Sequence, residues 1–176
     1  VEGARALTPV ERCDVGAGLE RETKTPPPEA APRVLESRAA LAEAWALRAA
    51  GRYTAAAERA RGAVELAESA AFPPAVAEAL LELARTLLVS GQPHAAREAA
   101  LRAADAAESA AEDEILAKSW LVVLGAMTKS ATKPEDTELF ARRARAVIAR
   151  MGEPSDLMAD LHEVLGAQRF ALGNWL

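Results

Sequence analysis

The segment Ala67-Glu68-Ser69-Ala70-Ala71 returns unchanged at residues 107–111, 40 residues further on. Extended backwards, the match pairs Gly51 with Gly91 and gives eleven identities over the 21 positions 51–71. The shared Gly, Glu and Ser carry most of the weight, because alanine-rich helices match one another by chance. A period of this length is typical of stacked helix pairs. The sequence therefore predicts an all-α solenoid.

Composition supports helices packed at close range. Of the 176 residues 51% are hydrophobic but only 4% are aromatic, so the apolar content is mainly Ala, with Leu and Val. Alanine has the highest helix propensity and lets helix axes approach closely, whereas strand-forming residues are sparse. The net charge of -5, from 21 basic and 26 acidic residues, gives no basic domain of the kind that binds nucleic acid.

The sequence also lacks the features of disulfide-bonded, membrane-spanning, metal-binding and catalytic proteins. Cys13 is the only cysteine, so neither an intrachain disulfide nor a Cys-based metal site is expected. No apolar run reaches the length of a membrane span, and the first residues lack a signal-peptide pattern. His94 and His162 stand apart from other ligand types, and a metal site needs three or four converging ligands. The serines lack a recognisable base, so no catalytic residue is predicted.

The chain divides into a lead-in and helical hairpins. Residues 1–31 form an irregular lead-in that ends in the stiff connector Thr25-Pro26-Pro27-Pro28. The repeats are predicted at 32–72, 73–111 and 112–152, with a partial fourth at 153–176. A hairpin without its second helix leaves an apolar face uncovered, so we expect the chain to be part of a longer protein. Helices are expected at 32–50, 53–70, 75–90, 93–110, from 113, at 135–151 and at 155–172, with a connection at 128–134 about four residues longer than its counterparts.

Apolar spacing predicts which side of each helix packs. In the first helix Leu35, Ala39, Ala42, Ala46 and Ala49 keep the i, i+3, i+4 spacing. In later helices the inward residues are predicted to be those in the following list: Leu80, Leu83, Ala84 and Leu87; Ala56, Ala60, Ala63 and Ala67; Ala96, Ala100 and Ala103; Trp120, Val123 and Met127; Phe140, Ala144, Val147 and Met151.

These residues resemble the tetratricopeptide repeat family. The family pattern of a Leu-Gly or Leu-Ala pair, a Gly-x-aromatic turn and small residues on the second helix is matched by Leu165-Gly166, Leu83-Ala84, Gly51-Arg52-Tyr53 and Gly173-Asn174-Trp175. The resemblance covers roughly residues 33–176. It implies a right-handed superhelix of about three and a half antiparallel helix pairs.

A second resemblance concerns the neighbourhood of the repeats. The lone cysteine, the proline-rich link, Ala-Gly-Arg-Tyr at 50–53, Ala-Lys-Ser-Trp at 117–120 and Leu-Gly-Ala at 165–167 are similar to the repeat region behind the catalytic domain of myxobacterial-type bacterial serine/threonine protein kinases. This resemblance implies ATP and Mg²⁺ in a parent protein, located in the cytoplasm or tethered to the inner membrane. The chain itself has no glycine-rich nucleotide loop, His-Arg-Asp or Asp-Phe-Gly, so it is predicted to be non-catalytic and without a cofactor.

The tetratricopeptide resemblance also implies a partner-binding groove on the first helix of each hairpin. The partner would be a protein or peptide, acidic or phosphorylated, that pairs with the arginines. Alternatively, Leu41, Trp45, Leu81 and Leu121 pack against the next repeat and the basic side chains are only solvated. The groove positions are Arg38, Leu41, Trp45, Arg48, Glu78, Leu81, Arg85, Leu88, Lys118, Leu121 and Gly125.

Three further alternatives stay open. The repeats could be a scaffold attached to another effector, or a small-molecule sensor with a pocket beside the lead-in. They could also form a homo-oligomer through the open end at 155–176, where Leu172 and Trp175 would contribute. Carboxylates at helical spacing (Glu65, Glu68, Glu78 and Glu82) are interpreted as a solvated face.

Overall fold

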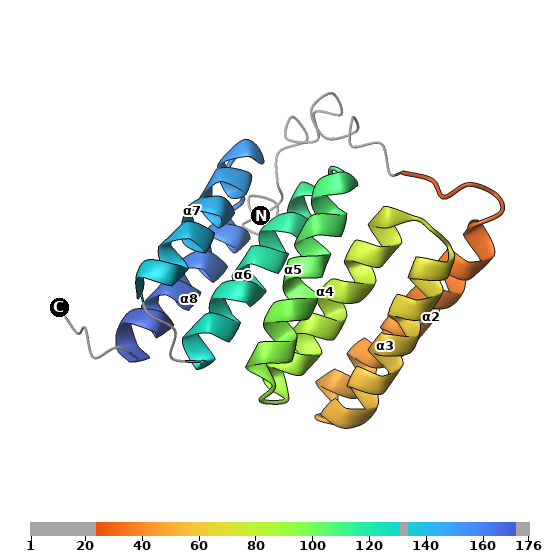
Figure 1. Cartoon of the computed structure of the whole chain (residues 1–176), viewed down its shortest axis with the longest axis horizontal. Helices are drawn as coiled ribbons and strands as arrows, with labels where there is room; N and C mark the ends of the chain where they lie inside the picture. The colour runs from red at the N-terminus through yellow and green to blue at the C-terminus, as the bar shows by residue number, and fades with distance from the viewer. Residues whose placement is uncertain (1–23, 131–133, 172–176) are drawn as a thin grey trace, which may run out of the picture.

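The computed structural model describes residues 24–130 and 134–171, and every regular element in these residues is a helix. Seven helices follow one another in this part of the chain and pack side by side (Figure 1). The all-α architecture and the repeated packing predicted from the sequence are confirmed. The helices are α2 Ala31–Ala49, α3 Tyr53–Ser69, α4 Pro73–Val89, α5 Pro93–Ser109, α6 Asp113–Lys129, α7 Pro134–Arg150 and α8 Ser155–Ala171.

The period of the repeat is the sum of two equal steps. Helices α3 to α6 have 17 residues each, and their first residues, Tyr53, Pro73, Pro93 and Asp113, are spaced evenly along the chain. Pro73 and Pro93 are the first residues of their helices. Proline has no backbone N–H, and at this position an N–H would have no partner within the helix. The connection between α6 and α7 is residues 130–133, only one residue longer than 90–92, so the predicted four-residue extension is wrong.

Left-handed residues end these helices in two ways. Gly51 and Gly91, which follow α2 and α4, have φ of 74° and 78°. The Arg52 N–H then donates to the Leu47 carbonyl at 2.9 Å, as in a Schellman cap. The duplicated Ala-Glu-Ser-Ala-Ala segments end α3 and α5 instead, and their last residues, Ala71 and Ala111, have φ of 49° and 51°. A Cβ makes this conformation unfavourable, so both alanines are strained.

Glycine at these two alanines is expected to stabilise the protein. Ala71→Gly and Ala111→Gly each remove the steric penalty of the left-handed region, and the greater freedom of glycine in the unfolded chain offsets part of the gain. We expect each change to add about 0.5–1 kcal/mol to the free energy of unfolding, measured by urea denaturation. Ala46→Gly, at an exposed position inside α2, is the control and should cost about 1 kcal/mol. Destabilisation by Ala111→Gly would contradict the assigned backbone conformation.

The core is one cluster along the stack, rich in alanine. Ala60, Ala63, Ala100 and Ala103 are fully buried where α3 and α5 meet their neighbours. The inward residues predicted for α3 to α6 are all buried, and in α7 Ala144 and Val147 are buried while Phe140 and Met151 are partly buried.

The predicted stripe of α2 lies on the wrong side. Leu35 is 67% exposed, and the alanines spaced with it are exposed as well. The buried residues of α2 are Val34, Ser37, Ala40 and Ala44. Because alanine occurs on every side of α2, apolar spacing does not select a face. The hydroxyl of Ser37 donates to the Ala63 carbonyl at 2.8 Å, which satisfies the one polar group in the buried stripe.

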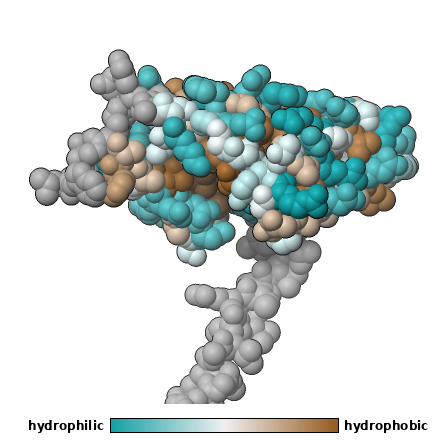
Figure 2. Space-filling model, turned by 90° about the horizontal axis from the view of Figure 1, so that it is seen from below, coloured by the Kyte–Doolittle hydropathy of each residue, from teal (hydrophilic) through white to brown (hydrophobic). Residues whose placement is uncertain are grey.

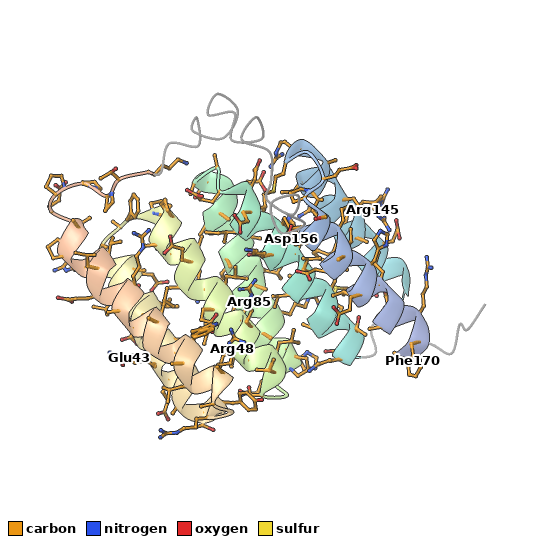
Figure 3. The ribbon with its side chains drawn as sticks, turned by 180° about the vertical axis from the view of Figure 1, so that it is seen from behind. Glu43, Arg48, Arg85, Arg145, Asp156 and Phe170 are labelled. Carbon is orange, nitrogen blue, oxygen red and sulfur yellow. The ribbon has the colours of Figure 1, made fainter. Side chains whose placement is uncertain are left out.

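The helices form two rows. Helices α2, α4, α6 and α8 contact one another in succession, and we call this row the wall. Helices α3, α5 and α7 form the second row, in which the backbones of successive described helices are not in contact. The two rows are visible from opposite sides in Figure 1 and Figure 3. No helix in the described residues combines the length and the apolar character that a bilayer crossing requires.

Candidate functional site

The wall carries all the groove residues predicted from the sequence. On α2, the positions 38, 41, 45 and 48 recur at three- and four-residue intervals and therefore share one side of the helix. The arginines at the two ends of this stripe both reach α4, so the stripe borders the α2–α4 contact. The predicted groove residues thus lie on three successive helices of the wall, α2, α4 and α6.

Two of the predicted arginines are already bonded within the wall. Arg38 donates from Nε and Nη2 to the two oxygens of Glu78 at 3.0 and 2.9 Å, a bidentate pair that raises the pKa of Arg38. Arg48 donates from Nε to Glu82 Oε1 at 2.7 Å. Both pairs join α2 to α4. They hold the wall together and leave these arginines poorly placed to bind an external acid.

Glu82 is a residue that sequence reasoning misjudged. It was expected on a solvated face, but it is only 9% exposed and accepts from Arg48. The fully buried Thr86 hydroxyl lies 3.5 Å from the same oxygen. The sequence did indicate that Glu82 is buried, because it lies inside the apolar run Leu80-Leu81-Glu82-Leu83-Ala84. A charged side chain buried in such a run needs an ion-pair or hydrogen-bond partner.

Three more predicted groove residues are not free to bind. Lys118 is paired with Glu114 one turn earlier on α6. Leu81 and Leu121 are buried in the core, so for these two the alternative of packing within the stack holds. The type of a side chain and its position along one helix do not distinguish these outcomes, because each outcome depends on the side chains of the neighbouring helix.

Arg85 differs from the other three cations among the predicted groove residues, Arg38, Arg48 and Lys118. Within residues 24–130 and 134–171 its guanidinium has no hydrogen-bonded or ion-paired partner, although it is partly buried. Burial lowers the pKa of Arg85, an effect that the Glu82 carboxylate opposes and the positive charge of Arg48 reinforces. Figure 3 places Arg85 beside Arg48 on this side of the molecule. Arg85 is therefore a partly desolvated cation whose N–H donors lack an acceptor in the described residues.

The predicted groove also contains apolar side chains that are not fully buried. Trp45, one turn before Arg48 on α2, is 59% exposed, and Leu41 and Leu88 are partly buried. A Cβ at Gly125 would lie 3.2 Å from Leu88 Cδ2, so α4 and α6 approach closely here. Seen from below, the molecule has a hollow where hydrophobic residues are exposed between hydrophilic parts (Figure 2).

The site residues offer no metal-binding chemistry of their own. No group of three or more His, Cys, Asp and Glu side chains lies together among the described residues. His94 and His162 are both exposed, and Cys13 lies outside the residues that the structure describes.

Comparison with known proteins does not supply a relative. No family model, curated protein or solved structure matches the chain. The functional inference therefore depends on the geometry of the wall.

Proposed function

We propose that the chain is a protein-binding region whose wall binds a peptide segment through Arg85 and Trp45. The observation that carries this proposal is Arg85 itself, a partly buried arginine without an ion pair in the described residues. A carboxylate of the partner would give it the charge-assisted, bidentate hydrogen bonds that Arg38 already makes with Glu78.

The apolar neighbours favour a peptide over a lone anion. An exposed tryptophan leaves a large apolar surface in water, and tryptophan is enriched among the residues that contribute most to binding at protein interfaces. Trp45 lies on the same stripe as Arg48, which is next to Arg85, so one short segment can reach both groups. The partner is thus a helical or extended segment with an apolar side chain and a nearby Asp or Glu.

The proposal also covers the repeat family of this region and the kind of protein to which it belongs. We infer a right-handed, tetratricopeptide-like repeat in a larger bacterial serine/threonine protein kinase, and its support is the sequence resemblance. The 40-residue step exceeds the 34 residues of a typical tetratricopeptide repeat, which leaves the repeat type to be tested. Reading the coding sequence upstream of Val1 tests the kinase: a glycine-rich loop with His-Arg-Asp and Asp-Phe-Gly supports it, and another domain contradicts it.

Peptide selection tests the wall directly. Twelve-residue peptides selected from a random display library on the immobilised protein should share an acidic and an apolar residue. Their affinities, measured by fluorescence anisotropy, should fall about tenfold or more in Arg85→Gln, because hydrogen bonds to a charged group are worth about 1.5–3 kcal/mol. Trp45→Ala should also weaken binding.

The controls make the result specific. Arg61→Gln removes an exposed arginine from α3, outside the wall, and should leave the affinity unchanged. Thermal melting followed by circular dichroism verifies that each variant is folded. A library that yields no binder, or a binder indifferent to both Arg85→Gln and Trp45→Ala, would contradict the proposal.

Self-association through the end of the stack stays a prediction. It was expected to involve residues 155–176, of which 172–176, including Leu172 and Trp175, lie outside the described residues. In the described part of α8, Phe170 is 63% exposed.

A further inference from the structure

A second group of arginines lies on the opposite side of the stack, between α5 and α7. Arg97 on α5 lies with its guanidinium carbon 5.8 Å from the centre of the Phe140 ring. Phe140 on α7 is itself 5.8 Å from the ring of Trp120 on α6, and Arg143 on α7 lies 5.2 Å above that ring. These four residues form what we call the arginine–aromatic cluster. They come from three helices, and α5 and α7 meet here through side chains, because their backbones are not in contact.

The repeat provides an internal comparison for this cluster. Helices α5 and α6 follow α3 and α4 by 40 residues, and α7 follows α5 by 41. The positions equivalent to Arg97, Trp120 and Phe140 are Ala57, Leu80 and Ala99, which are all buried and apolar. At these three positions the stack closes over α4 with apolar side chains only. Large aromatic and cationic residues over α6 are not needed to build this fold.

The fourth residue of the cluster, Arg143, has an arginine as its equivalent, but the two arginines have different partners. Arg102, the equivalent of Arg143, is ion-paired with Glu68 at 2.6 Å. The equivalent of Glu68 is Glu108. Its carboxylate acts on Arg150, whose pKa is raised mainly by Asp113 and to a smaller extent by the negative charge of Glu108. Among the described residues Arg143 has no ion pair, and it lies on Trp120 instead.

Arg97 has unused hydrogen-bonding capacity. Its Nε is shielded from solvent and has no acceptor in the described part of the chain. An N–H group without an acceptor in such a place is unfavourable. The other N–H groups of Arg97 lie in the plane of the guanidinium and not on its face over Phe140, so they can donate to a carboxylate of a ligand.

The surrounding charge has the same sign. From residue 139 to residue 152 the sequence contains four arginines and no acidic residue, although the whole chain has a net charge of -5. Arg142 and Arg145 are exposed on α7 next to the cluster, and Arg145 approaches Glu138 only to 3.5 Å. An aromatic pair thus separates Arg97 from Arg143, and Arg143 belongs to this basic stretch. Such an arrangement suits several carboxylates in sequence better than one isolated anion.

We propose that the arginine–aromatic cluster binds an acidic segment of a partner protein, with one carboxylate on Arg97 and another on Arg143. This site is separate from the groove residues of the wall, because Arg97, Phe140 and Arg143 come from α5 and α7 and Trp120 of α6 is not a groove residue. The partner is recognised by adjacent Asp or Glu residues and not by an apolar anchor, since Trp120 is only 5% exposed.

Binding of a fluorescein-labelled hexaglutamate peptide tests this site, with hexaglutamine as the uncharged control probe. Arg97→Gln and Arg143→Gln should each weaken the binding of hexaglutamate about tenfold at low ionic strength. Arg102→Gln is the matched control, since it removes the ion-paired equivalent of Arg143, and it should change the affinity less than twofold. Arg85→Gln should also have no effect, which separates this site from the wall.

Tryptophan fluorescence locates the bound peptide. Trp45→Phe with Trp175→Phe leaves Trp120 as the only one of three tryptophans, and its emission should change saturably with unlabelled hexaglutamate as Arg143 moves. Equal losses in Arg102→Gln and Arg143→Gln, binding unaffected by Arg97→Gln and Arg143→Gln, or no binding at millimolar peptide would overturn the proposal. Dimerisation in sedimentation velocity that Arg97→Gln and Arg143→Gln abolish would assign the site to a second copy and overturn it too.

Discussion

Replacing Leu124 by Ala is expected to lower the free energy of unfolding by about 2–5 kcal/mol. Leu124 is 1% exposed on α6, and α6 contacts four other helices, α4, α5, α7 and α8. Truncation removes buried methyl groups and leaves a cavity that rigid neighbouring helices cannot fill. Urea denaturation followed by circular dichroism measures the loss.

Leu139→Ala is the control for this experiment. Leu139 is 47% exposed on α7, so the same truncation there should change stability by less than about 0.5 kcal/mol. Tryptophan fluorescence should give the same transition as circular dichroism, because a single free energy is defined only for a two-state transition. A loss below about 1 kcal/mol for Leu124→Ala would mean that α6 is not the centre of a continuous core.

The second large effect is expected from the opposite change, Ala100→Leu. Ala100 is fully buried on α5, which lies against both α4 and α6. Helices that meet through alanine are too close for a leucine side chain, so the helices must separate or the side chain must adopt a strained rotamer. We expect a loss of about 1–3 kcal/mol, measured by the same denaturation.

Ala42→Leu tests whether the loss comes from packing. Ala42 is exposed on α2, and leucine has nearly the helix propensity of alanine, so stability should be almost unchanged. If Ala100→Leu were as neutral as Ala42→Leu, the close approach of α5 to its neighbours would be wrong.

The candidate sites show how much the resemblance to a repeat family could predict. The resemblance implied a groove with Arg38, Arg48, Arg85 and Lys118 on the first helix of each hairpin, and all four lie on the wall. It did not distinguish Arg85, which has no ion pair in the described residues, from the three that are paired. Arg38 meets Glu78 across 40 positions and Arg48 meets Glu82 across 34. A local pattern carries no information about contacts at that separation.

The arginine–aromatic cluster was not predicted for the same reason. Trp120 and Phe140 were both assigned to the packed side of their helices, which is correct, but Arg97 and Arg143 were not considered. The signal in the sequence was the run of four arginines at residues 139–152, together with Arg97 replacing Ala57 in the alignment of the repeats. Their convergence on one aromatic pair depends on three helices and appears only in the folded chain.

The sequence by itself determined that this protein is helical, where most helices begin and end, and that two helices make one 40-residue repeat. These features follow from interactions within a few residues: hydrogen bonds along each helix, prolines at the first turn, and glycine or alanine in the left-handed region at the last. The tertiary structure alone decided which side of α2 is buried, which cations are neutralised and which stay available. In an alanine-rich helix several faces are equally apolar, so the choice among them is made by the neighbouring helix.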